Sequence, residues 1–393
     1  MKTTAPLIIV GAGPAGLGCA IALQACGIQT RILDAREIAT SFLAWPRQMH
    51  LLTPSFHGNA FGLADLNAVS PQTSPADFLH TQHPDGPAYA RYLRALAAHY
   101  RLDIQAPVKV TGITPLKTGG FKLATDQGAE QAQFVIWAAG EFSHPDTGGI
   151  QGADHCLHNS RIRDWEEITQ TKQKHVVIGG YESGVDAAIQ LMHLGAEVHL
   201  LSRGEPWTLD DPDPSRSLSP HTRDRLREAL LTAPGQVQFY QNADIVRVRP
   251  MGADYEVLDR EGRSFHSPTK PILATGFRHA LEPVRHLWDW QSGLPVFTEA
   301  ADESTLTPGL FYSGPSLQHR GMLFCFIYKF RSRFGVIARA IAERLGQPWE
   351  QPLQLWKERG FMLEDLSCCS DCQCAVEAEE PIQPQIKDYA GTV

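Results

Sequence analysis

The sequence contains no apolar run that approaches the roughly 18 residues needed to span a bilayer. It has no internal repeat of fixed period and no long low-complexity tract. Its 35 Lys and Arg residues are outnumbered by 43 Asp and Glu residues, which gives a net charge of −8 and no basic stripe for nucleic acid. These absences disfavour a membrane-spanning, repeat-array or nucleic-acid-binding protein, and they predict a soluble one.

The N-terminus, MKTTAPLIIVGAGPAGL, lacks the pattern of a signal peptide, because its short apolar stretch runs directly into a glycine-rich turn. We therefore expect a cytoplasmic protein. Thiols are kept reduced in that compartment, so the eight cysteines are expected to be catalytic, metal-binding or inert rather than disulfide-bonded. A chain of 393 residues with 43% hydrophobic content is long enough for two or three domains.

The segment Leu7–Leu23 has the pattern of a dinucleotide-binding turn. Leu7–Val10 is a short apolar run that predicts a buried parallel strand, and a helix-like sequence rich in Ala and Leu follows the turn. The residues expected to bind a cofactor in the turn are Gly11, Gly13, Pro14, Ala15 and Gly16. The glycines allow a tight turn, the approach of a pyrophosphate and close helix packing, and the helix N-terminus offers free N–H groups. A second predicted strand ends at Asp34, whose carboxylate can bind a ribose hydroxyl pair.

The segment His175–Gly204 repeats this pattern with one departure. Val176–Ile178 predicts the strand. The expected cofactor-binding residues of the turn are Gly179, Gly180, Ser183 and Gly184. Tyr181 occupies the position of the middle glycine, so its side chain must point away from the phosphates or narrow their approach.

The second predicted strand of this segment ends in Ser202 and Arg203 rather than in an acid. An arginine offers a two-pronged set of donors to a 2′-phosphate, which an acid would repel. Ser202 and Arg203 therefore predict binding of NADPH rather than NADH. The alternative is that Arg203 is only a solvated charge at the end of a strand.

Two such turns in one chain suggest two nucleotides that exchange electrons. The pattern resembles the flavoprotein superfamily with two dinucleotide-binding domains, which includes disulfide reductases and class B flavin monooxygenases. Further matching segments are Phe134–Pro145, which contains Ala139 and Gly140, then Pro271–Phe277 and Leu306–Pro315. Many relatives carry Gly-Asp at the end of the last of these, where the aspartate contacts the ribityl chain. This sequence has Gly314 and Pro315 there, so Gly314 is kept as a cofactor-binding residue and the ribityl contact must come from elsewhere.

The resemblance implies an α/β fold with a discontinuous FAD-binding Rossmann-like domain, residues 1–150 and 300–365. An NADPH-binding Rossmann-like domain, residues 151–299, is expected to be inserted into it. Residues 366–393 form a cysteine-rich, acidic tail.

Two further segments are expected near the flavin ring because of the resemblance. The region of relatives that matches Ser41–Phe56 wraps the flavin, so Trp45, Arg47 and His50 are proposed contacts, with a structural hydrogen-bonded role as the alternative for His50. A helix predicted from about Met322 to Leu345 is expected to begin beneath the ring. Lys329 near its start is a proposed cofactor contact, and the alternative is that it lies on a solvated helix edge.

The sequence leaves the electron acceptor open. Disulfide reductases of the common kind carry a CxxC close to the flavin, and the predicted NADPH domain has none. The signature of class B monooxygenases is echoed by Gly152, His158 and Trp165, but Ile150 replaces its Phe and the histidine is displaced by two residues. Low-molecular-weight disulfide reductases also lack the usual CxxC in places, so the missing dithiol does not decide between the two classes.

The C-terminal tail contains cysteines that could relay electrons from the flavin to a substrate. Its start, LSCC, resembles the paired cysteines of mercuric reductases and of larger thioredoxin reductases, where an arm carries thiols to a flavin, usually in a partner subunit. This resemblance makes Cys368 and Cys369 the proposed catalytic thiols and suggests a homodimer. Four thiolates could instead hold Zn or another soft metal ion, and a tail without a chemical role is the third alternative. The four residues are Cys368, Cys369, Cys372 and Cys374.

We therefore predict an NADPH-dependent FAD oxidoreductase that passes electrons to a thiol, a disulfide or a thiol-bound metal. Its expected partner is a small-molecule substrate or low-molecular-weight disulfide. The alternatives are a class B flavin monooxygenase that uses oxygen and a metal-binding redox sensor.

Overall fold

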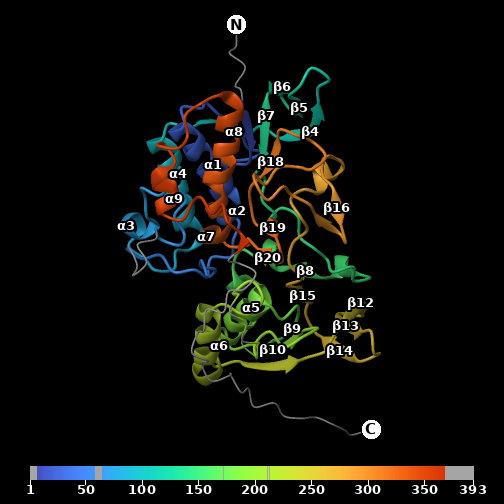
Figure 1. Ribbon diagram of the computed structural model, residues 1–393. Helices are drawn as coiled ribbons and strands as arrows, with labels where there is room; N and C mark the ends of the chain where they lie inside the picture. Colours follow the sequence, from blue (N-terminus) through green and yellow to red (C-terminus); the bar gives the residue numbers. More distant parts are fainter. Residues whose placement is uncertain (1–6, 58–63, 171, 210, 212, 368–393) are drawn as a thin grey trace. The chain divides into compact units, whose positions relative to one another are not determined.

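Each of the two predicted strand–glycine–helix segments supplies the central strand of a parallel sheet, in a separate unit of the chain (Figure 1). The structure, a computed structural model, describes residues 7–57, 64–170, 172–209, 211 and 213–367. Among these residues, the first unit falls within Met1–Leu43, Thr53–His144 and Arg278–Cys372, and the second within Ala44–Leu52 and Pro145–Phe277. The fold is thus α/β, as the sequence predicts.

The sheet of the first unit has five parallel strands in the order β18-β7-β1-β2-β3. Its strands are β1 (Leu7–Val10), β2 (Arg31–Leu33), β3 (Asp103–Gln105), β7 (Phe134–Trp137) and β18 (Leu310–Tyr312). Every residue of β1, β7 and β18 is buried, which explains their uninterrupted apolar sequences. The chain passes from β1 to β2 on one side and later adds β7 on the other, so the strand order reverses between β1 and β7. Sheets of this kind bind ligands at the carboxyl ends of the strands beside such a reversal.

Helices and small antiparallel sheets complete the first unit. The helices are α1 (Pro14–Ala25), α2 (Thr40–Leu43), α3 (Pro75–Leu79), α4 (Gly86–His99), α7 (Ile327–Phe330), α8 (Phe334–Leu345) and α9 (Gln354–Glu358). The antiparallel strands are β4 (Val110–Pro115), β5 (Phe121–Thr125) and β6 (Gly128–Ala132), and the short pair β16 (Trp290–Gln291) and β17 (Leu294–Pro295). Helix α8 runs beside α1 (Figure 1), and a Cβ at Gly18 would lie 2.0 Å from the Phe334 ring. Glycine at this position therefore allows α8 to support the helix that follows the first glycine turn.

The continuous helix predicted from about Met322 to Leu345 is wrong in its first part. Met322–Leu323 forms strand β20, which pairs with β19 (Gln318–His319) across a two-residue turn. Arg320 and Gly321 in that turn both have positive φ, 48° and 81°, the backbone of a tight hairpin turn. The helical part starts only at α7 and passes through the 3₁₀ turn Arg331–Arg333 before α8.

The second unit repeats the architecture of the first. Its parallel sheet has the order β11-β10-β9-β15-β8. The strands are β8 (Leu157–His158), β9 (Lys174–Ile178), β10 (Glu197–Leu201), β11 (Gln236–Tyr240) and β15 (Ile272–Leu273), beside an antiparallel sheet of β12 (Ile245–Met251), β13 (Asp254–Asp259) and β14 (Ser264–Ser267). Helices α5 (Glu182–His193) and α6 (Pro220–Thr232) belong to this unit. Val177, Ile189 and Leu200 are fully buried where α5 packs on the sheet.

The compact units divide the chain at 144/145 and 277/278, and residues 44–52 group with the second unit. The cofactor-based boundaries at 150/151 and 299/300 stay a prediction. The remaining short helical segments are 3₁₀ turns at Ala153–His155, Asn159–Arg161, Trp165–Glu167, Glu282–Leu287 and Arg331–Arg333.

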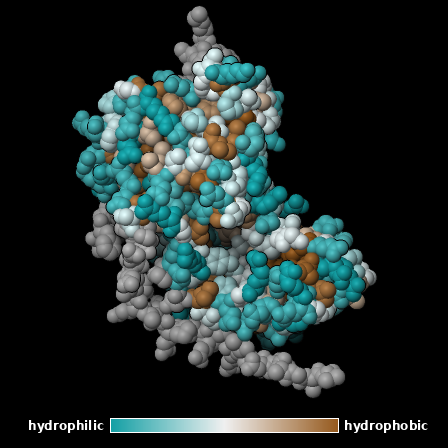
Figure 2. All heavy atoms as spheres, turned by 45° about the vertical axis from the view of Figure 1, so that its right-hand side comes forward, coloured by the Kyte–Doolittle hydropathy of each residue, from teal (hydrophilic) through white to brown (hydrophobic). Residues whose placement is uncertain are grey.

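The described surface is mainly polar. On the face shown in Figure 2, apolar side chains lie in small groups between polar ones. The large apolar side chains that are more than a third exposed come from separate segments of both units: Phe78, Leu209, Leu230, Leu231, Met251, Leu294 and Leu306. Within the described ranges, no helix combines the length and apolar character required to cross a membrane.

Candidate cofactor and electron-transfer site

In the first glycine turn, the backbones of the turn, helix α1 and the residue after β7 approach one another too closely for a side chain to lie between them. Gly11 has a φ of +111°, and a Cβ there would lie 2.3 Å from the carbonyl oxygen of Ala138. A Cβ at Gly16 would lie 1.9 Å from the carbonyl oxygen of Gly11. These two glycines are therefore required by the packing of the turn itself.

Gly13, by contrast, faces open space. It is the N-cap residue of α1, and a Cβ there would meet no atom within 4 Å. Pro14 occupies the first helical position and Ala15 follows it as a buried residue. The open space lies at a helix N-terminus that offers unpaired N–H groups, which is the environment that binds a pyrophosphate. The residues present thus fit a dinucleotide.

Asp34 follows β2 directly, as predicted, and its carboxylate also accepts a hydrogen bond from the backbone of the glycine turn. One oxygen of its carboxylate accepts a hydrogen bond of 2.7 Å from the backbone N–H of Ala12, and the other accepts one of 2.9 Å from that of Arg36. The carboxylate is only partly buried. Asp34 is therefore fixed beside the turn with lone pairs left for a ribose.

The exits of β7 and β18 lie at the same edge of the sheet as this turn, because these strands run parallel to β1. Ala139 and Gly140 follow β7, and both are partly exposed. Gly314 follows β18 with a φ of +149°, and a Cβ there would lie 2.9 Å from the Tyr312 hydroxyl oxygen. These three predicted residues therefore lie at the edge where a flavin nucleotide is expected.

Sequence reasoning missed a polar cluster at this edge. Burial raises the pKa of Glu141 to about 7, and the hydroxyl of Ser316 acts in the opposite direction. The backbone N–H of Ser316 donates a hydrogen bond of 3.0 Å to the Tyr312 hydroxyl. Burial raises the pKa of Tyr312, and the charge of Glu141 acts in the same direction. Only the position of Glu141 directly after the Ala139–Gly140 turn could have signalled it in the sequence.

The second glycine turn has the same geometry as the first. Gly179 has a φ of +110°, and a Cβ there would lie 2.2 Å from the carbonyl oxygen of Ala274. A Cβ at Gly184 would lie 1.7 Å from the carbonyl oxygen of Gly179. A Cβ at Gly180 would lie 2.4 Å from that of Ser202, so this glycine permits the close approach of β10. The second turn therefore also fits a dinucleotide.

Tyr181 replaces the middle glycine without closing the turn. Its backbone, with φ −91° and ψ −164°, nearly equals that of Gly13, with φ −89° and ψ −172°. Its hydroxyl donates hydrogen bonds to the carbonyl oxygens of Ser217, at 2.6 Å, and Pro214, at 3.1 Å. The side chain thus points toward the loop that precedes α6. The middle position needs no glycine for local packing, and the departure from the pattern does not block the turn.

Ser202 and Arg203 lie at the end of β10, as predicted. Ser202 is buried and its backbone N–H donates to the carbonyl oxygen of Tyr240. Arg203 is exposed, and Ser183 lies partly buried in the first turn of α5. The guanidinium of Arg203 is thus accessible at the carboxyl end of β10, and its role toward a 2′-phosphate stays a prediction.

The middle of the segment predicted to wrap the flavin, residues 44–52, groups with the second unit. The guanidinium of Arg47 pairs with the Asp164 carboxylate at 2.5 Å and with that of Glu166 at 3.5 Å. Trp45 is partly buried and His50 is exposed. The assignment of these residues to the cofactor therefore stays a prediction.

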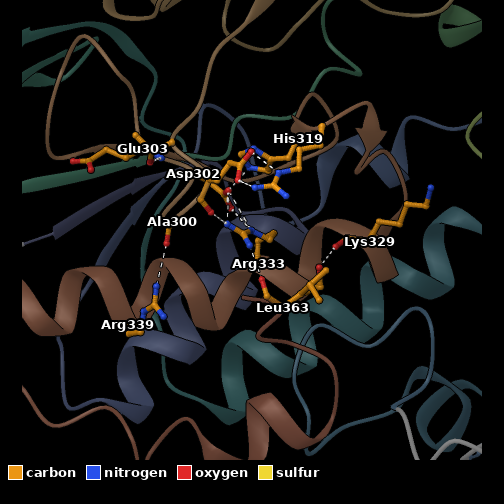
Figure 3. A network of polar contacts seen from close by, with 12 residues as sticks. Ala300, Asp302, Glu303, His319, Lys329, Arg333, Arg339 and Leu363 are labelled. Atoms are coloured by element: carbon orange, nitrogen blue, oxygen red, sulfur yellow. Dashed lines mark hydrogen bonds and ion pairs between the residues drawn. The ribbon is translucent and has the colours of Figure 1, made fainter. Parts of the chain in front are cut away.

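A buried ion-pair network fixes the start of α8 in the first unit (Figure 3). The guanidinium of Arg333 donates to the Asp302 carboxylate at 3.0 Å, and His319 Nε2 lies 2.6 Å from an oxygen of the same carboxylate. Arg333 is 1% exposed and Asp302 is fully buried. Lys329 extends away from this network, with its ammonium 6.0 Å from the Phe326 ring centroid. The network is structural, and the role of Lys329 toward a cofactor stays a prediction.

The residues that echo the monooxygenase signature have structural roles in the second unit. His158 is buried, its Nδ1 lies 2.8 Å from the Ser160 hydroxyl, and its Nε2 lies 3.1 Å from the carbonyl oxygen of Gly276. A Cβ at Gly152 would lie 2.0 Å from the carbonyl oxygen of Val248, and Trp165 is 1% exposed. Packing accounts for Gly152 and Trp165, and hydrogen bonds account for His158. None of the three needs a role in a reaction with oxygen to explain its position.

The described cysteines do not form a redox pair. Burial raises the pKa of Cys19 to about 12, that of Cys26 to about 11 and that of Cys156 to about 12. None of these, nor the exposed Cys325, forms a disulfide within the described residues. No group of three or more His, Cys, Asp or Glu side chains that could hold a metal ion is found among those residues. Cys368, Cys369, Cys372 and Cys374 lie outside them.

The sequence matches the model of a protein family over residues 8–314, which include both glycine turns and the exits of β7 and β18. The chain belongs to the pyridine nucleotide-disulphide oxidoreductase family. It is therefore an FAD- and NADPH-dependent oxidoreductase. The assignment of the two glycine turns to its nucleotides stays a prediction.

Relatives from both predicted classes resemble the chain. Bacilliredoxin reductase Bdr of Bacillus subtilis (strain 168) is 25% identical over 345 residues, which cover 86% of this chain and 97% of that protein. A probable indole-3-pyruvate monooxygenase, YUCCA1 of Arabidopsis thaliana, is 24% identical over 82% of this chain and 75% of its own length. The solved structure of bacillithiol disulfide reductase Bdr (YpdA) from Staphylococcus aureus shares the fold, with a TM-score of 0.69 and 20% identity over 87% of this chain and 99% of that one.

Proposed function

We propose that the protein uses NADPH to reduce its FAD and passes the electrons to the disulfide of a low-molecular-weight thiol. This proposal rests on the similarity to bacilliredoxin reductase Bdr, which extends over 86% of this chain and 97% of that protein. Reduction of the disulfide yields two thiols, with two electrons from NADPH, one proton carried with them and one proton from the medium. The structural roles of His158 and Trp165 favour this function over oxygen insertion.

Arg203 and Ser202 are proposed to bind the 2′-phosphate of NADPH. A hydrogen bond between charged groups contributes about 1.5–3 kcal/mol, so Arg203→Ala should raise the KM for NADPH about 10- to 100-fold. The KM for NADH, which lacks the phosphate, should change little. Steady-state kinetics with both nucleotides checks this, with Arg260→Ala as the control, because Arg260 is also exposed and pairs with Asp244 in the same unit. An equal rise for NADPH and NADH would reject the assignment.

The C-terminal cysteines are proposed as the thiol stage between flavin and substrate. Cys369 and Cys372 have the C-x-x-C spacing in which one thiol is often easier to ionise than a free cysteine. The thiols of Cys19, Cys26 and Cys156 are poorly suited to this role, because burial keeps them protonated. The double variant Cys368→Ser/Cys369→Ser should keep flavin reduction by NADPH and lose disulfide turnover. Unchanged disulfide turnover would remove the tail from the reaction.

A soft metal ion on the tail is the alternative role for the same four cysteines. Metal analysis of the purified full chain beside a variant with all four replaced by serine separates the two roles. Bound zinc that depends on these cysteines, with no change in disulfide turnover, would support the metal-binding redox sensor.

The acceptor itself is tested by reducing the full chain with NADPH under anaerobic conditions and then adding one acceptor at a time. Glutathione disulfide, bacillithiol disulfide, Hg(II) and oxygen form a suitable panel. Rapid reoxidation by one disulfide and slow reoxidation by oxygen support the proposal. A long-lived oxygen adduct in the flavin spectrum would support the class B monooxygenase.

A cytoplasmic location and a homodimer are proposed as well. NADPH and reducible low-molecular-weight disulfides are both available in the cytoplasm. In a dimer the tail of one subunit could serve the flavin of its partner. Mixing two inactive variants, one altered at Cys368 and Cys369 and one in the first glycine turn, should restore activity only in such a dimer.

A further inference from the structure

Tyr181 connects the second glycine turn to the segment that precedes helix α6. Its hydroxyl donates to the carbonyl oxygens of Ser217, at 2.6 Å, and Pro214, at 3.1 Å, which lie three residues apart in the chain. Its ring packs against the buried apolar residues of the second unit, so the position of the hydroxyl is fixed. Because Tyr181 occupies the position of the middle glycine, this connection starts at the turn itself.

Glu182, the next residue, holds the start of α6. One oxygen of its carboxylate accepts a hydrogen bond of 2.5 Å from the backbone N–H of Ser219, and the other accepts one of 2.6 Å from the Thr222 hydroxyl. Ser219 is the N-cap residue of α6, and both partners are buried. The two carboxylate oxygens are therefore directed to α6. Without these partners the carboxylate, in the first turn of α5, would compete with a phosphate for the N–H groups there.

The chain that leaves β10 also contacts the turn at a second point. A Cβ at Gly180 would lie 2.8 Å from the ring of Trp207, which is 2% exposed. Trp207 follows Arg203, the residue at the end of β10, by four positions. The chain between β10 and α6 thus lies against the turn at Gly180 and, through the hydroxyl of Tyr181, at residues 214–217.

We propose that Tyr181 is a positioning residue for NADPH: its hydroxyl holds residues 214–217 beside the second glycine turn, where they form one wall of the nucleotide site. This inference rests on the proposed binding of NADPH at that turn. A wall that is in place before the nucleotide arrives loses no conformational entropy on binding. Tyr181 therefore raises the affinity for the nucleotide, although it departs from the glycine pattern.

The test measures the binding of NADP⁺ to the FAD-loaded full chain by titration calorimetry. Tyr181→Phe keeps the ring and removes the hydroxyl, so the dissociation constant should rise about 3- to 10-fold, the effect of losing one hydrogen bond. Tyr181→Gly restores the glycine pattern and should also weaken binding. Unchanged affinity of Tyr181→Phe, or tighter binding by Tyr181→Gly, would overturn the proposal.

Asp186→Asn is the matched control. Helices α5 and α6 pack against each other (Figure 1), and the Asp186 carboxylate on α5 pairs with the guanidinium of Arg225 on α6 at 2.7 Å. Asp186 lies one helical turn beyond Glu182, so its replacement loosens the same two helices and leaves residues 214–217 in place. The urea midpoint of unfolding should fall, and the affinity for NADP⁺ should stay the same. An equal loss of affinity in Asp186→Asn and Tyr181→Phe would overturn the positioning role.

Two further measurements separate positioning from a loss of stability. Arg216 is exposed within residues 214–217, so trypsin should cleave after it faster in Tyr181→Phe than in wild type, and NADP⁺ should slow this cleavage. Rapid anaerobic mixing of Tyr181→Phe with NADPH should give the wild-type limiting rate of flavin reduction at a higher half-saturating concentration. Equal cleavage rates, or a lower limiting rate at the wild-type half-saturating concentration, would contradict the proposal.

These measurements need no electron acceptor, so they do not depend on the proposed disulfide substrate. If wild type binds no NADP⁺, the proposed NADPH site is wrong and this inference is wrong with it. If wild type binds NADP⁺ and Tyr181→Phe binds it equally well, the NADPH site stands and only the role of Tyr181 is rejected.

Discussion

Replacing Asp302 with asparagine is expected to destabilise the protein by about 3–5 kcal/mol, the cost of leaving a buried charge without its partner. The uncompensated charge is the guanidinium of Arg333, which is 1% exposed and donates to both carboxylate oxygens of Asp302. Asparagine tolerates the φ of +55° at this position, so the change removes the charge and leaves the backbone unstrained. Urea unfolding of the FAD-loaded protein measures the effect.

Glu299→Gln is the control for this prediction. The Glu299 carboxylate pairs with Arg320 close to the same network, but both side chains are about half exposed, at 46% and 48%. Exposed pairs of this kind contribute little to stability, so the unfolding midpoint should hardly move. Equal effects of the two substitutions would show that burial of the Asp302–Arg333 pair is not what makes it important.

Gly16→Ala is expected to weaken FAD binding by at least about 100-fold, or about 2.7 kcal/mol. The added methyl group would lie 1.9 Å from the carbonyl oxygen of Gly11, and this neighbour is backbone that cannot rotate away. The turn must therefore open, and the N–H groups that face the pyrophosphate move with it. Titration of the apoprotein with FAD, followed by flavin fluorescence, gives the affinity.

Gly13→Ala tests the effect of an added methyl group on cofactor binding without disturbing the packing of the turn. The new methyl group would meet no protein atom within 4 Å, so the apoprotein should unfold at the same urea concentration as wild type. It would occupy the open space at the helix N-terminus, so FAD affinity should still fall. A lower unfolding midpoint for Gly13→Ala than for Gly16→Ala would contradict this account of the turn.

The sequence predicts the nucleotide-binding turns well because their pattern is local. An apolar strand, glycines at fixed spacing and a helix all lie within about 20 residues, and steric contacts with neighbouring backbone explain Gly11, Gly16, Gly179 and Gly184. The direction of the Tyr181 side chain was not predictable, since it depends on the carbonyl groups of a loop more than 30 residues away.

Features that depend on contacts between residues far apart in the sequence were not predicted. Glu141 and Ser316 lie far apart in the sequence and come to the same edge of the sheet only because β7 and β18 are neighbours. Arg47 pairs with Asp164 more than 100 residues away, which no local pattern indicates. The helix predicted from Met322 was shortened by a tight turn at Arg320 and Gly321, where the hairpin pairing outweighs the helical tendency of the following residues.

The most direct test of the account counts the products of NADPH oxidation when oxygen and a disulfide are both present. Full-length, FAD-loaded protein is mixed with NADPH and bacillithiol disulfide or glutathione disulfide in air-saturated buffer. Thiols, hydrogen peroxide and remaining NADPH are then measured at equal times. We expect two thiols for each NADPH consumed with one of these disulfides, and almost no peroxide. Consumption of NADPH and oxygen without thiol formation would contradict it.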